Sequence, residues 1–228
     1  MNKKQDIIFV TIVILVFAPF FLSHKLFEFY INFNQQHGLI ASFIKFAILA
    51  TSGELIGLRI KTGKYYKKGF GILPRMIVWG FIGITVKLSF NFFITETPLV
   101  LEYFGMTDAT KVIQQSFSYE KLLVAFCIST SLNVLYAPLM MTFHKITDIH
   151  IVNNGGSLLG LFRPIKFRKI LLNLNWNIQL NFVFKKTIPF FWIPAHTITF
   201  LLPPDFQVLF AALLGIALGV ILAIADFT

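Results

Sequence analysis

Six long apolar stretches constrain the fold of this 228-residue chain more than any other feature of its sequence. They cover residues 7–22, 39–58, 72–94, 122–143, 187–202 and 206–225. A helix needs about 20 mostly apolar residues to cross a bilayer, so four stretches are long enough and two are short. With 56% hydrophobic and only 13% charged residues, a soluble domain of this size could not bury its apolar surface. The sequence predicts one all-α membrane domain over residues 1–228, a polytopic bundle of five or six transmembrane helices.

The first and last of these stretches have local signals beside them. Lys3 and Lys4 precede the first stretch, as in a signal peptide, but residues 20–25 offer no small-residue cleavage site. We therefore expect the first stretch to be retained as a helix. Pro203 and Pro204 separate the last two stretches, and because consecutive prolines cannot continue a helix, we expect a tight reversal there.

The basic residues fall mainly on one of the two sides that these stretches define. The net charge is +10, and of the 20 Lys and Arg residues only Lys25, Lys111 and Lys121 lie on the opposite side. The larger group comprises Lys3, Lys4, Arg59, Lys61, Lys64, Lys67, Lys68, Arg75, Lys145, Arg163, Lys166, Arg168, Lys169, Lys185 and Lys186. Because cytoplasmic loops carry such an excess, we expect both termini in the cytoplasm. The positive charge then reflects topology rather than nucleic-acid binding.

The connection between the fourth and fifth stretches has a pattern of its own over residues 162–178. One face holds Lys166, Lys169, Asn173 and Asn177, and another holds Phe167, Leu171, Leu174 and Ile178. This spacing predicts an amphipathic helix on the cytoplasmic leaflet, with Trp176 at the level of the headgroups. Alternatively, residues 170–186 lengthen the fifth helix, which would place Lys185 and Lys186 in hydrocarbon. We prefer the surface helix.

Small residues recur at helical spacing in three stretches. They are Ala211, Gly215, Gly219 and Ala223 in the last stretch, Gly53 and Gly57 in the second, and Gly80 and Gly83 in the third. Lipid gives apolar helices no hydrophobic reason to associate, so small residues that allow close approach mark helix contacts. We expect the last helix to pack on a neighbouring helix or on a second copy of the chain, forming a homo-oligomer. Pro138 is expected to bend the fourth helix.

Polar side chains within the stretches are candidates for a permeation path, because an ionisable group in a membrane span is costly and marks function by default. They are Lys45, Glu54, Lys87, Asn91, Asn133 and His196. Lys45 and Glu54 are nine residues apart, which puts them on opposite faces of a helix. Lys45 and Lys87 fall at a similar depth in adjacent antiparallel helices and would favour anions. The alternative for both lysines is that they extend to the outer interface.

Signals for catalysis and cofactors are weak. The five histidines form no metal-binding motif, and the single Cys127 lies in an apolar stretch. His144 and Asp148 are four residues apart and share a helix face, but no nucleophile accompanies them. We assign this pair a structural role beside the membrane. The sequence predicts no catalytic residue, no metal and no cofactor.

Several short motifs occur in the order found in a known family. Gly53-Glu54 is similar to a Gly-Asp pair, Gly80-Phe81-Ile82-Gly83 to Gly-Phe-x-Gly-Pro, and residues 133–138 to Gln-x-x-Phe-Ala-Pro. The C-terminal positions are Trp192, His196, Thr199, Phe200 and Pro204, where the family has Trp, Gln, Asn, Phe and Pro. Over residues 48–223 the chain resembles the Mpv-type family of peroxisomal and mitochondrial inner-membrane proteins. Pro138 ends the third of these motifs.

This resemblance implies a distant relative of that family. The ratio of 16 Lys to 4 Arg is typical of an AT-rich bacterial genome, so we expect a bacterial protein placed in the plasma membrane. The chain departs from the family pattern at Val208, where an Arg is usual, at Gly219, where a Trp is usual, and at Leu132, where an Asp is usual. Members of the family are thought to act as channels or metabolite carriers. The resemblance therefore implies passage of a small solute.

Three classes of function are compatible with these observations. The first is a channel or carrier that lets a small solute or ion permeate the lipid bilayer. The second is a scaffold or assembly factor that recruits partners without transport, and the third and weaker one is an intramembrane enzyme built on Glu54 or His144. We expect the first of these and expect that the chain is not an enzyme.

Overall fold

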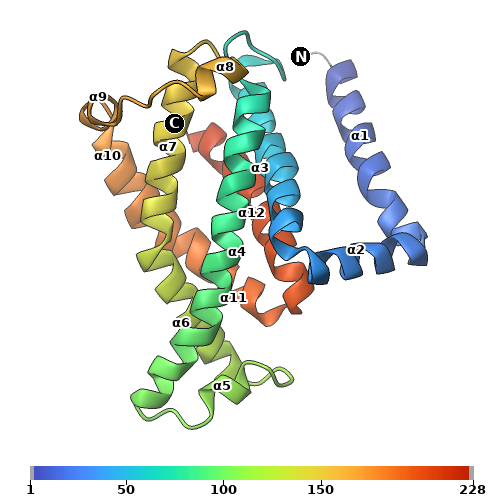
Figure 1. Cartoon of the computed structure of the whole chain (residues 1–228), viewed down its shortest axis with the longest axis vertical. Coiled ribbons are helices and arrows are strands. Elements are labelled where there is room, and N and C mark those ends of the chain that lie inside the picture. The colour runs from blue at the N-terminus through green and yellow to red at the C-terminus, as the bar shows by residue number, and fades with distance from the viewer. Residues whose placement is uncertain (1–2, 226–228) are drawn as a thin grey trace.

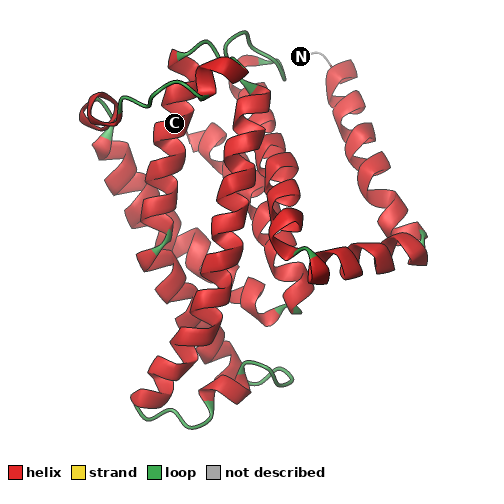
Figure 2. Cartoon of the chain, in the orientation of Figure 1, coloured by secondary structure: helices red, strands yellow, loops and turns green. Residues whose placement is uncertain are grey.

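The computed structural model describes residues 3–225, with side chains placed at all of these except residues 3, 16, 21 and 218–225. Within this range all regular secondary structure is helical, loops connect the helices, and no strand is present, as the sequence predicts (Figures 1 and 2). The first half contains α1 (Lys3–Leu22), α2 (His24–Gln36), α3 (Gly38–Thr62), α4 (Ile72–Tyr103), α5 (Ala109–Val112) and α6 (Tyr119–Leu135). The second half contains α7 (Ala137–Asn153), α8 (Leu158–Leu161), α9 (Phe167–Leu172), α10 (Trp176–Ile178), the π-helix η1 (Gln179–Trp192), α11 (Ile193–Leu201) and α12 (Pro204–Ala225).

Each apolar stretch lies within one helix or within two consecutive helices. Two helices, α3 and α4, are long and apolar enough to cross a membrane by themselves. Two bent pairs, α1 with α2 and α6 with α7, also pass this test when each pair is taken together, so the described residues provide up to four such spans. The fold is therefore an all-α bundle with helices that are compatible with membrane insertion.

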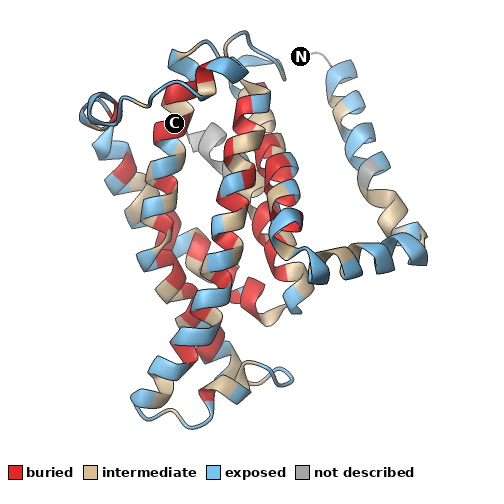
Figure 3. Ribbon diagram, in the orientation of Figure 1, coloured by how far each residue is buried: buried red, intermediate tan, exposed pale blue. Residues whose placement is uncertain are grey.

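The helices alternate in direction along the bundle (Figure 1). α1, α4 and the segment α10–η1–α11 run from the end where α8 lies toward the end where α5 lies. α3, the pair α6–α7 and α12 run back toward α8. Buried residues form stripes along the inner faces of these helices, whereas α1 and α2 are mostly exposed (Figure 3).

The most extensive packing joins α3 to α4 and to α12, and small residues make it possible. A Cβ atom on Gly53 would lie 2.8 Å from Ile216 Cα of α12, and one on Gly83 would lie 2.5 Å from Ser42 O of α3. Gly53, Gly83 and Gly215 thus lie at helix contacts, and α3 is the neighbour of α12. Gly219 and Ala223, the other half of the stripe, fall outside the residues whose side chains are described.

The fourth stretch is broken where a bend was expected. α6 ends at Leu135, α7 begins at Ala137, and the two helices meet at an angle of 43°. Pro138 lies in the first turn of α7. N–H groups in the first turn have no acceptor within the helix, so the N–H that proline lacks costs no hydrogen bond there. The prolines between α11 and α12 likewise give the predicted reversal, with Leu202 in an extended conformation.

A single amphipathic helix over residues 162–178 is not present, and this prediction is corrected. Only Phe167–Leu172 is helical as α9, and Asn173–Asn175 separate it from α10. From Trp176 the chain continues as one helical segment to Leu201. The alternative that we did not prefer, in which these residues lengthen the fifth helix, therefore describes residues 176–186 better. The exposed ammonium of Lys185 donates to Asn181 Oδ1 at 3.0 Å, which gives it a polar neighbour on the same helix.

One helix, α2, was not expected from the sequence. Ser23 caps its first turn by accepting a hydrogen bond from the Leu26 N–H at 3.4 Å. α2 meets α1 at 87° and runs sideways from the end of α1 to the start of α3, so α1 stands beside the bundle rather than within it (Figure 1). The sequence signal was the Ser N-cap, which the apolar-stretch criterion overlooks.

A charged contact fastens the first turn of α1 to the end of α3. Arg59 donates through Nε and Nη2 to the two carboxylate oxygens of Asp6, each at 2.8 Å, and Tyr65 Oη donates to Oδ1 at 3.1 Å. All three residues lie just outside the apolar stretches. The hydrogen bonds from Arg59 lower the pKa of Asp6 below its ordinary value. Burial and the hydrogen bond to Asp6 raise the pKa of Tyr65.

We expect this contact to be lost only in acid. Because the pKa of Asp6 is lowered on folding, its contribution is fully present above the ordinary carboxyl pKa of about 4 and is lost as the pH falls further, through the lowered pKa of the folded protein. Spin labels on exposed positions 4 and 64 should therefore report one short distance from pH 7 to about pH 5 and a broader one below about pH 4. Asp6→Asn should give the broad distribution at every pH, and Asp108→Asn should not. A pH-independent distance in the unsubstituted protein and in Asp108→Asn would contradict this assignment.

Candidate functional site

A buried cluster of charged and polar side chains joins three helices near the α8 end of the bundle. Glu54 comes from α3, Arg75 and Trp79 come from α4, and His144 and Asp148 come from α7. We call these five residues the ion network. Its arginine is 7% exposed, so the charges are largely withdrawn from solvent.

The loop before α4 positions Arg75. Gly71 has a φ of 75°, a left-handed conformation that favours glycine, and its carbonyl accepts from the Arg75 N–H at 3.0 Å. A Cβ atom on Gly71 would lie 2.5 Å from Ile151 Cγ2 of α7 and 2.9 Å from Gly156 Cα. The glycine therefore lets the start of α4 press against α7, which brings Arg75 within reach of Asp148.

Both oxygens of the Glu54 carboxylate accept hydrogen bonds. Oε1 lies 2.9 Å from Trp79 Nε1 and 2.9 Å from His144 Nε2, and Oε2 accepts from Arg75 Nη1 at 2.5 Å. Arg75 also donates through Nη2 to Asp148 Oδ1 and through Nε to the Phe70 carbonyl at 2.8 Å. The guanidinium thus bridges two carboxylates on different helices, the fork geometry for which arginine is better suited than lysine.

A second polar pair lies between α6 and α11, in the half of the bundle away from the ion network. Asn133 Nδ2 lies 3.0 Å from His196 Nδ1 and donates to the Ser129 carbonyl at 2.8 Å. The imidazole also packs against Trp192, with ring centroids 5.1 Å apart, and edge-on against Phe90. Both polar side chains therefore find hydrogen-bonding partners within the protein, and their mutual contact joins two helices, as expected for groups that their own helix cannot satisfy.

A third polar group surrounds the start of α3. Lys45 donates to Asn34 Oδ1 at 2.5 Å, and Asn34 donates to Asp205 Oδ1 at 3.0 Å. Lys87 belongs to the same region, because a Cβ atom on Gly38 would lie 3.6 Å from its Cε. The two lysines are close enough to interact electrostatically, which agrees with the similar depth calculated from the sequence.

The six permeation-path candidates fall at three separate places. Glu54 lies in the ion network, Asn133 pairs with His196, and Lys45 lies near Lys87. Asn91 is exposed, one turn beyond the half-buried Lys87. The structure therefore brings the candidates together in pairs and not in one cluster.

Sequence reasoning missed Arg75 and Trp79 and gave Asp148 only a structural role. A signal was available, because the chain uses Lys for most of its positive charges and has only four arginines. Two of these, Arg59 and Arg75, make fork-shaped contacts with carboxylates. An arginine in a lysine-rich chain therefore indicates a site where geometry matters as well as charge.

Most of the glycine and aromatic positions that carry the family resemblance pack against neighbouring helices, whereas Pro204 is exposed. Gly53 contacts α12, Gly80 and Gly83 contact α3, and Phe200 packs on Phe90 with ring centroids 4.9 Å apart. The remaining positions are Glu54 in the ion network, Pro138 in the first turn of α7, Trp192 at the end of η1 and Pro204 at the start of α12. No protein-family model, curated protein or solved structure matches the chain. The resemblance therefore stays a prediction.

Two surface hollows lie away from the polar groups described above. One is on α9, and the other is beside α5, where Glu102 and Lys111 contribute to its wall. Neither contains a permeation-path candidate. Among the residues that the structure describes, no three His, Cys, Asp or Glu side chains are grouped so that they could hold a metal ion.

Proposed function

We propose that this chain is a multi-pass protein of a bacterial plasma membrane that lets a small solute or ion permeate, as a channel or carrier. Its crossings would be α1, α3, α4, the pair α6–α7, the segment α10–η1–α11 and α12. Both ends of the chain would face the cytoplasm, on the side that carries the basic excess. The single observation that carries the proposal is the ion network, which connects α3, α4 and α7 near that side.

The physical chemistry of buried charges favours a functional role for this network. Replacing a buried ion pair by well-packed apolar residues is often neutral or stabilising, so the network is not required for stability alone. Packed helices move between discrete arrangements, and a guanidinium held by two carboxylates can release one of them. We infer that contacts of Arg75 with Glu54 and Asp148 hold the cytoplasmic ends of these helices in a closed arrangement.

The pair Lys45 and Lys87 supports the choice of solute. Two positive charges near each other in a region of low dielectric attract an anion strongly. Asp205 is the acidic residue that interacts electrostatically with Lys45. Its carboxylate already accepts hydrogen bonds from Asn34 at 3.0 Å and from Gln35 at 3.1 Å. A small anion or anionic metabolite is therefore the solute class that fits this end of the bundle best.

Release from liposomes tests the proposal. Purified protein in sealed liposomes should release entrapped anions, and Glu54→Gln should change the rate by about tenfold, the equivalent of about 1.4 kcal/mol for one weakened charged hydrogen bond. The rate should rise, because the network is inferred to hold the closed arrangement. Glu96→Gln is the matched control, because Glu96 is an exposed acid on α4. Equal rates for empty liposomes and for folded, inserted protein would contradict the proposal.

A scaffold or assembly factor is the second candidate, and the position of α1 favours it. α1 makes its backbone contacts with α2, and Ile7 is 66% exposed. Such a helix, held beside the bundle mainly by α2 and by the contact of Asp6 with Arg59, offers an apolar face to a second membrane protein. Absence of flux together with recovery of a crosslinked partner through labels on α1 would favour this function. An intramembrane enzyme built on Glu54 or His144 remains the weakest candidate.

A further inference from the structure

α9 forms a corner of the molecule at the end where α8 lies (Figure 1). It packs on α7, and Ile170 and Leu174 are the buried residues that hold this corner in place. The other side chains of α9 are largely exposed. α9 therefore presents one face to the protein and the other to its surroundings.

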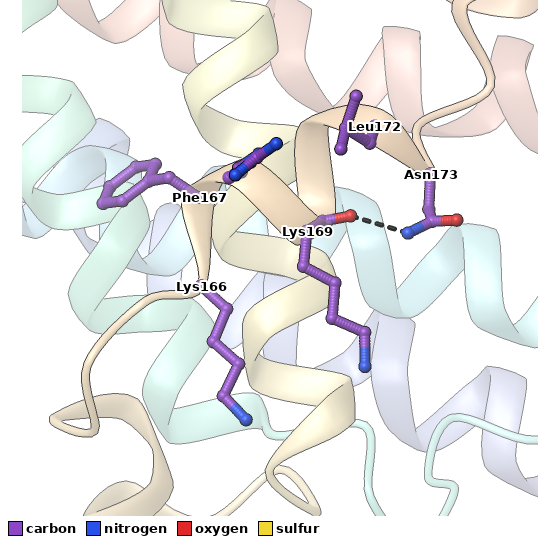
Figure 4. Close-up of a pocket in the computed structure, with 6 residues that line it drawn as sticks. Lys166, Phe167, Lys169, Leu172 and Asn173 are labelled. Carbon is purple, nitrogen blue, oxygen red and sulfur yellow. Dashed lines mark hydrogen bonds between the residues drawn. The ribbon is translucent and has the colours of Figure 1, made fainter.

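The exposed side contains a shallow hollow (Figure 4). Its walls are Lys166, Phe167, Arg168, Lys169, Leu172 and Asn173. In Figure 4, Lys166 and Lys169 extend to the same side of the ribbon, and Phe167 points away from them. Asn173, which follows the last residue of the short helix, donates to the Lys169 carbonyl at 2.7 Å and so closes its last turn.

The positive charge of this hollow is not compensated locally. The sequence contains no Asp or Glu between Asp148 and Asp205, a segment that includes all three bases of the hollow. Within residues 3–225 no ion pair is formed by Lys166, Arg168 or Lys169. Three cations therefore share a small surface without an anion.

Exposed apolar side chains lie in the hollow and in the neighbouring parts of the chain. Phe162 and Leu172 are each 73% exposed, and Phe167 is also exposed. Trp176, next along the chain, is partly exposed and donates through Nε1 to the Leu171 carbonyl at 2.9 Å. A combination of basic and apolar groups is typical of a segment that lies in the interface of an anionic membrane.

We propose that the hollow on α9 binds the headgroup of an anionic phospholipid. The three bases would contact the phosphate, and the neighbouring phenylalanine and leucine side chains would contact the acyl chains. The apolar rim favours a lipid over a free anion, because inorganic phosphate gains nothing from apolar contacts. This inference is independent of the proposed transport function, since it would hold for a scaffold as well.

Lipid binding by the purified full-length chain tests the proposal. The probe is phosphatidylglycerol added to the protein in micelles of a neutral detergent, with phosphatidylcholine for comparison, and retained lipid is counted by native mass spectrometry. The test variant combines Lys166→Gln, Arg168→Gln and Lys169→Gln. The control combines Lys64→Gln, Lys67→Gln and Lys68→Gln, which removes the same charge from the exposed loop between α3 and α4.

We expect the α9 variant to bind phosphatidylglycerol about 100-fold more weakly, because each basic residue near an anionic surface contributes about fivefold. The control should lose much less. Equal losses in both variants would show a general charge effect and would overturn the α9 site, as would unchanged binding in the α9 variant. Inorganic phosphate at millimolar concentration should not displace the lipid, and full displacement would identify a free-anion site instead. Circular dichroism of the α9 variant checks that its fold is intact.

Discussion

Replacing Arg75 with alanine is expected to lower the free energy of unfolding by about 3–5 kcal/mol, the largest effect we expect from one substitution in this protein. The loss comes from the two carboxylates left behind, since Glu54 and Asp148 would remain close together without the guanidinium between them. Unfolding of the purified protein in detergent, followed by tryptophan fluorescence, measures the change. Trp79 reports on the network directly, because its indole donates to Glu54.

Two further variants distinguish loss of the network from loss of an arginine side chain in general. Arg163→Ala removes an exposed arginine with one long contact of 3.4 Å to Asn154, and it should change stability by less than about 0.5 kcal/mol. Adding Glu54→Gln to Arg75→Ala should recover part of the loss, since only one unpaired carboxylate then remains. Independent, additive effects of these two substitutions would show that the side chains do not interact.

Replacing Gly53 with alanine is expected to cost about 1–3 kcal/mol, although it adds only one methyl group. That methyl group would lie 2.8 Å from Ile216 Cα and 3.0 Å from the Gly215 carbonyl oxygen, both backbone atoms of α12. A backbone cannot move aside as a flexible side chain can, so α12 would have to shift as a whole. Thermal unfolding in detergent gives the magnitude.

Gly215 on the facing helix provides a matched control. A Cβ atom there would lie 3.6 Å from Ala50 Cβ, an ordinary van der Waals distance. Gly215→Ala should therefore be neutral or gain up to about 1 kcal/mol from helix propensity. Equal destabilisation by the two substitutions would mean that α3 and α12 do not pack at the described distance.

The helix contacts of these glycines were predictable only in part from the sequence. The glycine spacing predicted that the helices pack closely, and Gly53 and Gly83 do lie at helix contacts. It left open whether the last helix meets a neighbour or a second copy of the chain, and α3 is that neighbour. The prediction of one amphipathic surface helix over residues 162–178 was wrong, because residues Asn173–Asn175 are not helical. Counting the spacing of apolar residues does not detect such a local break.

The amino-acid sequence by itself determined the helical class, the positions of the long helices and the unequal charge of the two ends. These properties depend on runs of neighbouring residues, and the length of an apolar run is local information. The tertiary structure alone decided which polar groups meet. Glu54 lies 21 positions from Arg75 and 90 from His144, so their contact depends on how each helix is rotated about its axis. That rotation is set by close packing at Gly53, Gly71 and Gly83, where one methyl group would change it.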